Sequence, residues 1–187
     1  QTARDSTVNA HYTRRDIARA MWDAAANMGF RAGGSVLEPG MGNGNFFMMM
    51  PEDLLPGSSR TGVEMDLLTG AMARALYPGS NIIVKPYQET NLPDGYFDLV
   101  IGNVPFGSSA VYDPEFRRKP YLTENIHNYF FAKSMLKLRP GGVMLAITSR
   151  YTMDSKSTAF RKWMAEQAEF LGAVRLPRDT YKANAGT

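Results

Sequence analysis

A short stretch near the start of the chain combines a carboxylate with three alternating glycines. Glu38 is followed by Gly40, Gly42 and Gly44, and apolar residues stand on both sides. Glycine allows sharp turns and close approach of a ligand to the main chain, so the pattern predicts a strand, a loop and a helix that hold a nucleotide-like cofactor. Two phosphate-binding loops do not fit, because the third glycine of G-x-G-x-x-G would fall on Asn45 and no Gly-Lys-Ser/Thr occurs. Glu38 would repel a pyrophosphate but could hold an ammonium group.

A second carboxylate stands where a ribose would bind. Glu64 lies in a predicted strand over residues 60–65, about 20 residues after the glycine loop. Its two oxygens can accept hydrogen bonds from both ribose hydroxyls. A solvated acid at a strand end is the alternative, and the nearby glycine loop favours the binding role. Gln88, after a predicted strand over 81–84, could reach an adenine, although a polar turn explains it equally well.

Residues 103–106, Asn-Val-Pro-Phe, follow a predicted strand over 97–101 and resemble the [DNS]-P-P-[YF] motif of amino methyltransferases. An exocyclic amine is a poor nucleophile because its lone pair is delocalised into the ring. Two acceptors facing the amine can hold that lone pair toward a methyl donor. The Asn103 side chain and the Val104 carbonyl can supply them, while Pro105 stiffens the turn and Phe106 offers a face to the base. These four residues are the predicted catalytic residues, and an ordinary proline-containing loop is the alternative.

The elements that must position these residues alternate along the chain. A capping box of Thr13 and Asp16 predicts the start of the first helix. Helices are expected over about 13–28, 45–50, 67–77, 124–138 and 156–169, and strands over 35–39, 60–65, 81–84, 97–101, 143–148 and 171–175. This alternation predicts an α/β fold, a doubly wound and mainly parallel sheet with helices on both faces. The carboxyl ends of the strands then form the edge at which ligands bind.

Composition limits the classes of function. The 187 residues, 44% of them hydrophobic, are enough for one domain with its own core. The absence of cysteine and the presence of only two histidines exclude disulfides and thiolate metal sites and lead us to expect no metal. No apolar run approaches the roughly 18 residues of a membrane span, so we expect no membrane association and a cytoplasmic location. The net charge of +3 is compatible with nucleic acid but is weak evidence for it.

The combined motifs resemble N6-adenine DNA methyltransferases of the γ-type motif order. The stretch at 36–46 is similar to the first motif of enzymes that use S-adenosyl-L-methionine (AdoMet), and Tyr12-Thr13 precede it. Over nearly the whole chain the resemblance narrows to the methylase region of large phage and plasmid proteins that join such a domain to a helicase, some of them antirestriction proteins. The shared stretches are N-A-H-Y-T (9–13), V-L-E-P-G-M-G-N-G-N-F (36–46), G-V-E-M-D (62–66), I-G-N-V-P-F-G (101–107), H-N-Y-F (127–130), L-R-P-G-G (138–142), T-S-R-Y-T-M-D (148–154) and K-A-N-A-G-T (182–187).

This resemblance implies a class I AdoMet-dependent methyltransferase with a Rossmann-like fold, encoded by a bacterium, phage or plasmid. Its substrate would be an adenine flipped out of double-stranded DNA, with Phe106 and Tyr181 on the two faces of the base. The implied cofactor-binding residues are Tyr12, Thr13, Glu38, Gly40, Gly42, Glu64, Met65 and Gln88. Such folds usually close with a hairpin of two further strands, and we expect the last strand to be missing here. The chain, starting at Gln1, is expected to be one methyltransferase domain (1–187) of a longer protein, with an irregular arm over 1–12.

This chain departs from the family pattern at Val104, which replaces a proline, and at Gln88, which replaces an acid. Residues 107–123 form a long connection without periodicity, expected on the substrate side. There, Arg117, Arg118 and Lys119 stand among aromatic residues, a combination that suits a nucleic-acid backbone, although a solvated loop is an equally good interpretation. Two other functions stay open: a protein glutamine methyltransferase, and a module of a larger helicase-containing protein that binds AdoMet or DNA without turnover.

Overall fold

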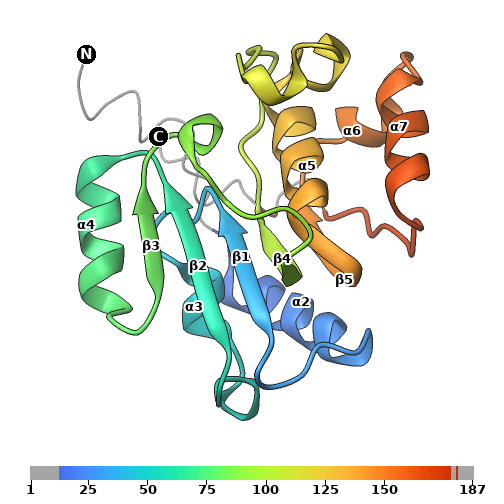
Figure 1. The fold of residues 1–187 in the computed structure, drawn as a ribbon. Coiled ribbons are helices and arrows are strands. Elements are labelled where there is room, and N and C mark those ends of the chain that lie inside the picture. Colours follow the sequence, from blue (N-terminus) through green and yellow to red (C-terminus); the bar gives the residue numbers. More distant parts are fainter. Residues whose placement is uncertain (1–12, 178–179, 181–187) are drawn as a thin grey trace.

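A computed structural model describes residues 13–177 and residue 180, and its centre is a five-stranded parallel sheet (Figure 1). The strands are β1 (Ser35–Pro39), β2 (Ser59–Glu64), β3 (Asn81–Val84), β4 (Phe97–Asn103) and β5 (Leu138–Ile147). Their spatial order is β3-β2-β1-β4-β5, and every neighbouring pair is parallel. The order reverses between β1 and β4, which is where open α/β sheets bind their ligands. The predicted α/β fold with a mainly parallel sheet is confirmed.

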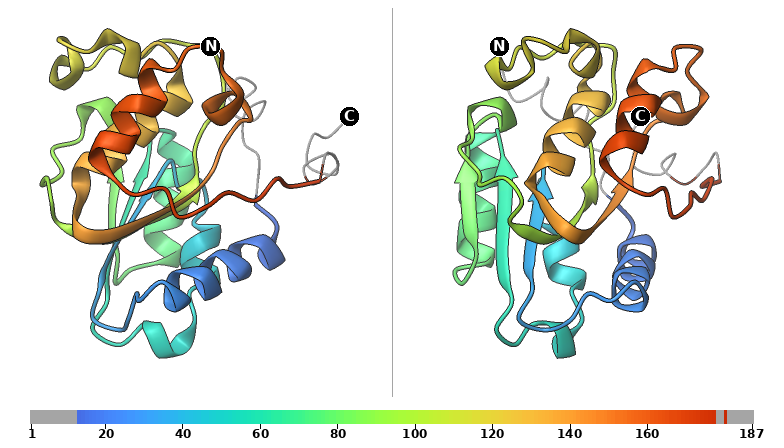
Figure 2. Two further views of the ribbon diagram at one scale, coloured as in Figure 1. Left: turned by 90° about the vertical axis from the view of Figure 1, so that its right-hand side faces the viewer. Right: turned by 45° about the vertical axis from the view of Figure 1, so that its right-hand side comes forward.

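Helices cover both faces of this sheet. The α-helices are α2 (Arg15–Asn27), α3 (Asn45–Met49), α4 (Leu67–Leu76), α5 (Ile126–Lys137), α6 (Tyr151–Asp154) and α7 (Ala159–Gln167). The short 3-10 helices are η1 (Glu52–Leu54), η2 (Tyr87–Glu89), η3 (Pro114–Phe116) and η4 (Pro120–Leu122). Side chains of α2, α3 and α4 form one apolar cluster with the sheet. Side chains of α5 and α7, which lie side by side, form the other (Figure 2).

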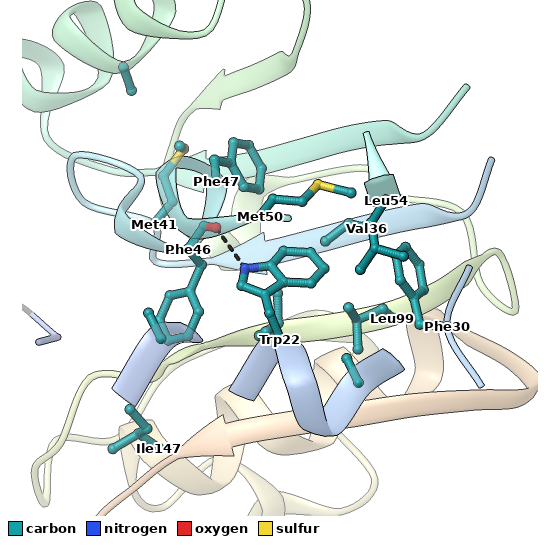
Figure 3. Close-up of a cluster of buried hydrophobic side chains, with 14 of the residues drawn as sticks. Trp22, Phe30, Val36, Met41, Phe46, Phe47, Met50, Leu54, Leu99 and Ile147 are labelled. Atoms are coloured by element: carbon teal, nitrogen blue, oxygen red, sulfur yellow. Dashed lines mark hydrogen bonds between the residues drawn. The ribbon is translucent and has the colours of Figure 1, made fainter. Parts of the chain in front are cut away.

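Alternation along β1 explains why both faces are apolar. Successive side chains of a strand point to opposite faces, so Val36 enters the cluster below α2 and Leu37 the cluster below α5. In the first cluster, the Trp22 side chain is fully buried and its indole N–H donates a hydrogen bond to the Phe46 carbonyl at 2.8 Å (Figure 3). This bond joins α2 to α3, so the helix that follows the glycine loop is fixed to the core.

The structure corrects three expected elements. Thr13 and Asp16 form no capping box: the N-cap residue of α2 is Arg14, and Asp16 accepts a hydrogen bond from the Ile17 N–H. Residues 138–142, expected as a turn, are the start of β5, with a register shift between Phe97 and Leu99 on the partner strand. Residues 171–177 form no strand, and the Val174 side chain is 87% exposed. In the part of the chain that the structure describes, no strand follows β5, so the sixth strand expected over 171–175 is absent there.

Candidate active site

The glycine loop lies at the carboxyl edge of the sheet, between β1 and α3. Gly40, Gly42 and Gly44 all have positive φ angles, of 65°, 56° and 78°. Only glycine adopts this left-handed backbone without strain, so the three positions require it. The Met41 N–H donates to the Val63 carbonyl of β2 at 2.8 Å, which fixes the loop to the neighbouring strand.

Tyr77, at the end of α4, supports the loop from outside. Its hydroxyl donates to the Gly44 carbonyl at 2.8 Å and lies 3.2 Å from the Asn43 carbonyl. A Cβ atom at Gly44 would lie 2.4 Å from the Tyr77 ring, whereas a Cβ at Gly42 would meet none of the described atoms within 4 Å. Sequence reasoning missed this role of Tyr77, and no local pattern signals a contact across 33 residues.

Glu64 joins the loop to the end of β2. One carboxylate oxygen accepts from the Gly42 N–H and the other from the Asp66 N–H, both at 2.8 Å. A carboxylate oxygen has two lone pairs, so each retains acceptor capacity for a hydroxyl group. Beside it the Met65 side chain is 70% exposed, and Asp66 caps α4 by accepting from the Thr69 N–H. The structure thus leaves a carboxylate and an exposed thioether next to the glycine loop.

Glu38, by contrast, is 2% exposed and lies beneath the loop. Burial raises the pKa of Glu38 well above its usual value; the N–H groups of Phe46 and Phe47 act in the opposite direction, and the charge of Glu64 raises the pKa further. The Glu38 Oε2 atom has no hydrogen-bond partner among the described residues. A cationic donor such as an ammonium group suits this oxygen, because it would offset the desolvation of the carboxylate.

The predicted catalytic motif ends β4, immediately beside the loop. Asn103 pairs in register with Ile147 of β5, and the Val104 N–H donates to the Ile147 carbonyl at 3.1 Å. The Pro105 ring lies 3.7 Å from the position that a Cβ of Gly40 would take. The structure therefore places the glycine loop and the motif next to each other. Phe106 is half-buried and packs against both apolar clusters.

His127, in the first turn of α5, supports the chain just after this motif. The His127 side chain is 4% exposed, and its Nδ1 atom lies 3.1 Å from the Gly107 carbonyl. Burial lowers the pKa of His127 and the contact with Gly107 raises it, with burial dominant. The ring is therefore neutral at pH 7, and the tautomer with hydrogen on Nδ1 donates to Gly107. Nothing in the sequence signals this role, since His127 stands there only as part of the stretch H-N-Y-F (127–130) shared with the resembling family.

Four further residues were predicted to contact the cofactor or the base; the structure describes Thr13 and Gln88 but not Tyr12 and Tyr181. Thr13 is buried, and its carbonyl accepts from the Asn45 side-chain amide at 3.1 Å, next to the glycine loop. Gln88 is half-buried in η2, directly after β3. Tyr12 and Tyr181 lie outside the described residues.

The connection over 107–123 is held on α5 by buried charges. Asp113 accepts hydrogen bonds from the Lys133 ammonium at 2.9 Å, the Tyr129 hydroxyl at 2.8 Å and the Glu115 N–H at 3.0 Å. Burial alone would raise the pKa of Asp113, but these hydrogen bonds outweigh it and hold the pKa below its usual value. The connection is thus anchored at its middle, a feature that its sequence did not indicate.

The basic residues of this connection do not join the motif. Arg118 and Lys119 line a groove with Leu136 in the last turn of α5 and with Trp163 and Gln167 on α7. The last turn of α5 leads directly into the amino end of β5, whereas Asn103 stands at the carboxyl end of β4. Arg117 adjoins them in the sequence. Two of the predicted trio therefore line a groove to which neither the glycine loop nor the motif contributes a residue.

In the part of the chain that the structure describes, no group of three or more His, Asp or Glu side chains could hold a metal ion. Within the same residues, no helix has the length and apolar character needed to cross a bilayer.

Sequence comparisons relate this chain to restriction-modification proteins. The family "Eco57I restriction-modification methylase" matches residues 76–180, a range that includes Asn103–Phe106. "Defense against restriction protein B" of Escherichia phage P1 is 32% identical over 182 residues. This match covers 95% of the chain but only 8% of the phage protein.

Solved structures show the same fold. The methyltransferase subunit of a type I restriction-modification system from Streptococcus thermophilus has a TM-score of 0.73 at 16% identity, over 85% of this chain and 39% of that one. TrmN from Thermus thermophilus has a TM-score of 0.55 at 20% identity, over 80% and 40% of the two chains. A Methanococcus maripaludis protein assigned to the AdoMet-dependent methyltransferases has a TM-score of 0.51 at 14% identity, over 81% and 64%. The sheet order and the cofactor-side edge described above thus belong to a widespread architecture.

Proposed function

Because this chain belongs to the Eco57I restriction-modification methylase family, we propose that it transfers a methyl group from AdoMet to the N6 amine of an adenine in DNA. The observation that carries the proposal is the proximity of the glycine loop to the motif at the end of β4. Pro105 lies 3.7 Å from the Cβ position of Gly40, so a cofactor in the loop and an amine held by the motif would be neighbours. Proximity of this kind is a large part of catalysis for a direct transfer between two bound molecules.

The residues at the edge fit AdoMet. Glu38 offers a buried oxygen without a partner among the described residues, which suits the ammonium group of the methionine part. Glu64 retains acceptor capacity for the ribose hydroxyls, and the exposed Met65 can pack on the adenine of the cofactor. Gln88, Thr13 and Tyr12 complete the proposed contacts. When bound, AdoMet supplies an electrophilic methyl group on a sulfonium.

The chain's own contribution is to position and polarise the amine. The Asn103 side-chain oxygen and the Val104 carbonyl accept the two N–H groups of the amine, which turns its lone pair toward the methyl group. The hydrogen bond from the Val104 N–H to Ile147 fixes the peptide plane before Val104, and Pro105 restricts Val104 to an extended backbone, which limits the direction of its carbonyl despite the missing first proline. Phe106 stacks on the adenine, which leaves the duplex, and Tyr181 packs on the opposite face. Catalysis of this type requires no metal and no covalent intermediate with the protein.

The test is methyl transfer by an Asn103→Ala variant. Labelled AdoMet is offered with duplex DNA and, separately, with protein acceptors, and the DNA product is sequenced for N6-methyladenine. We expect Asn103→Ala to abolish transfer to DNA while calorimetry shows AdoMet binding close to that of the unsubstituted chain. Asn91→Ala, which changes an exposed loop residue, is the matched control and should retain activity.

Two results would reject the proposal. An Asn103→Ala chain that still methylates adenine would show that the motif does not hold the amine. Transfer by the unsubstituted chain to glutamine in protein but not to DNA would show that the substrate is a protein.

We also propose that residues 1–187 form one methyltransferase domain of a cytoplasmic polypeptide that carries a helicase. The support is the similarity to the phage protein, of which this chain spans 8% of the length. Mass spectrometry of the protein isolated from its host would test this, and a product of only about this size would contradict it.

A further inference from the structure

The chain that follows β5 emerges beside the proposed catalytic motif. Asn103 and Ile147 are paired in register, and the Val104 N–H bonds to the Ile147 carbonyl, so the end of β5 adjoins the motif. Arg150 stands three residues after Ile147 and is exposed. Three residues span at most about 10 Å, so the Arg150 side chain lies within reach of a nucleotide bound at the motif.

The segment that bears Arg150 is firmly held. Thr152 is 2% exposed, and its hydroxyl lies 2.8 Å from the hydroxyl of Thr148. The Arg161 guanidinium of α7 donates to the Ser155 carbonyl at 2.7 Å. These contacts fix both ends of the short helix α6 while Tyr151, at 58% exposure, faces outward.

Arg150 is pre-oriented and makes no ion pair with the described residues; the carboxylate of Asp154, one turn further along, acts on it from a distance and is itself paired with Arg175. Its guanidinium lies 5.0 Å above the Tyr151 ring and donates to the Tyr151 hydroxyl at 3.2 Å. Within the described residues, no carboxylate lies within 4.0 Å of Arg150 or of the exposed Lys156, whereas Lys133 and Lys137 are paired with carboxylates. A cation that is ordered but not neutralised by the protein is suited to an anionic ligand.

Charge also divides the edge of the sheet into two halves. The carboxylates Glu38, Glu64 and Asp66 stand near the ends of β1 and β2, on the proposed cofactor side. Arg150 and Lys156 stand after β5, on the other side of Asn103, and the one carboxylate between them in the sequence, Asp154, is paired with Arg175 at 3.2 Å. A phosphodiester backbone would be repelled from the first half and attracted to the second.

We infer that Arg150 and Lys156 bind backbone phosphates beside the target nucleotide, with Tyr151 positioning the Arg150 guanidinium. This inference rests on the proposed function, because it takes DNA as the substrate. The phosphates closest to the reacting amine would thus be bound by the segment that follows β5. Contacts by the predicted trio of residues 117–119 would lie near the last turns of α5 and α7, farther from the flipped base.

The test is the salt dependence of DNA binding by single substitutions. Fluorescence anisotropy of a labelled duplex is measured from 50 to 200 mM salt for Arg150→Gln, Lys156→Gln and Arg118→Gln. Loss of one phosphate contact should reduce the slope of log K against log salt by about one, and Arg150→Gln should weaken binding about tenfold at the lowest salt. Arg118→Gln should have the smaller effect. Arg19→Gln, an exposed arginine of α2, is the matched control and should leave the slope unchanged.

Tyr151 is tested through rescue. Tyr151→Phe keeps the ring below Arg150 and should retain most of the affinity, whereas Tyr151→Ala should approach the Arg150→Gln value. Calorimetric AdoMet binding by each variant verifies that the fold is intact.

The inference is overturned if Arg150→Gln binds duplex DNA with unchanged affinity and slope while Arg118→Gln loses both. Methyl-transfer assays keep this result separate from the proposed function. A chain that binds DNA through Arg150 but never methylates it would reject the proposed function and leave the phosphate site standing.

Discussion

The glycine loop makes a quantitative prediction, because two of its glycines differ only in what surrounds them. Gly42 and Gly44 both have left-handed backbones, and an alanine in that conformation costs about 1–2 kcal/mol. At Gly42 the new methyl group meets none of the described atoms within 4 Å, so this strain is the whole expected effect on the free energy of unfolding. Gly42→Ala should therefore destabilise the fold by about 1–2 kcal/mol.

At Gly44 the methyl group would lie 2.4 Å from the Tyr77 ring, which must move. Moving it breaks the hydrogen bond from Tyr77 to the Gly44 carbonyl, worth about 1 kcal/mol, and overpacks the site at a further cost of about 1–3 kcal/mol. Gly44→Ala should then lower the free energy of unfolding by about 2–4 kcal/mol more than Gly42→Ala. For a chain of this length the corresponding difference in Tm is roughly 4–16 °C.

Urea unfolding followed by tryptophan fluorescence, without added AdoMet, measures both variants. The double variant Tyr77→Ala/Gly44→Ala is the control. Its free energy of unfolding should fall below that of Tyr77→Ala alone only by the cost of the backbone strain at residue 44. Equal destabilisation by Gly42→Ala and Gly44→Ala would refute the reasoning, since it would mean that Tyr77 does not confine the loop.

Two further predictions concern buried charges. Burial raises the pKa of Glu38, so the folded chain holds a proton on this carboxyl more tightly than the unfolded chain does. The contribution of this proton to the free energy of unfolding is therefore complete below about pH 4 and is lost as the pH rises through the pKa of the folded state. The effect of Glu38→Gln on the free energy of unfolding, measured by thermal unfolding, should therefore be more favourable at pH 8 than at pH 4. The same substitution should weaken AdoMet binding in calorimetry. Unchanged affinity would show that Glu38 does not bind the cofactor. Asp113→Asn leaves the buried Lys133 ammonium with only the more distant Glu115 carboxylate, at 3.8 Å, and should cost about 3 kcal/mol in urea unfolding. Adding Lys133→Met should recover most of that loss, and no recovery would contradict the pairing.

Elements specified by local pattern could be predicted from the sequence. β1 and β3 have the predicted bounds, because short apolar runs there are flanked by polar and glycine residues. The proximity of Gly40 and Pro105 also follows from the sequence, since parallel strands place their carboxyl ends at one edge. Motif spacing combined with topology therefore predicted correctly that the glycine loop and the motif are neighbours.

Elements that depend on a neighbouring strand could not be predicted in this way. Arg139–Gly142 has the composition of a turn, yet Pro140 and Gly141 lie within β5. An edge strand tolerates proline, because one side of its backbone needs no partner. Residues 171–175 have an apolar strand-like composition but no partner strand in the described part of the chain, and composition does not reveal that.

Contacts between an irregular segment and a helix were also out of reach. In the sequence, Lys133 looks like an ordinary polar residue of a helix. Its burial depends on the ion pair with Asp113, 20 residues earlier. Neither residue belongs to a periodic pattern that would bring them together. The anchoring of the 107–123 connection, like the support of Gly44 by Tyr77, follows only from the packed fold.

The outer edge of β5 has a consequence for solubility. No strand of the described residues pairs with this edge, and β5 is 10 residues long. Pro140 lacks an N–H group and interrupts the first part of the edge, but the apolar stretch Val143–Ile147 offers unpaired backbone groups to another chain. Where nothing else covers this edge, it offers a route to edge-to-edge association at high protein concentration, and a charged side chain within that stretch would oppose it.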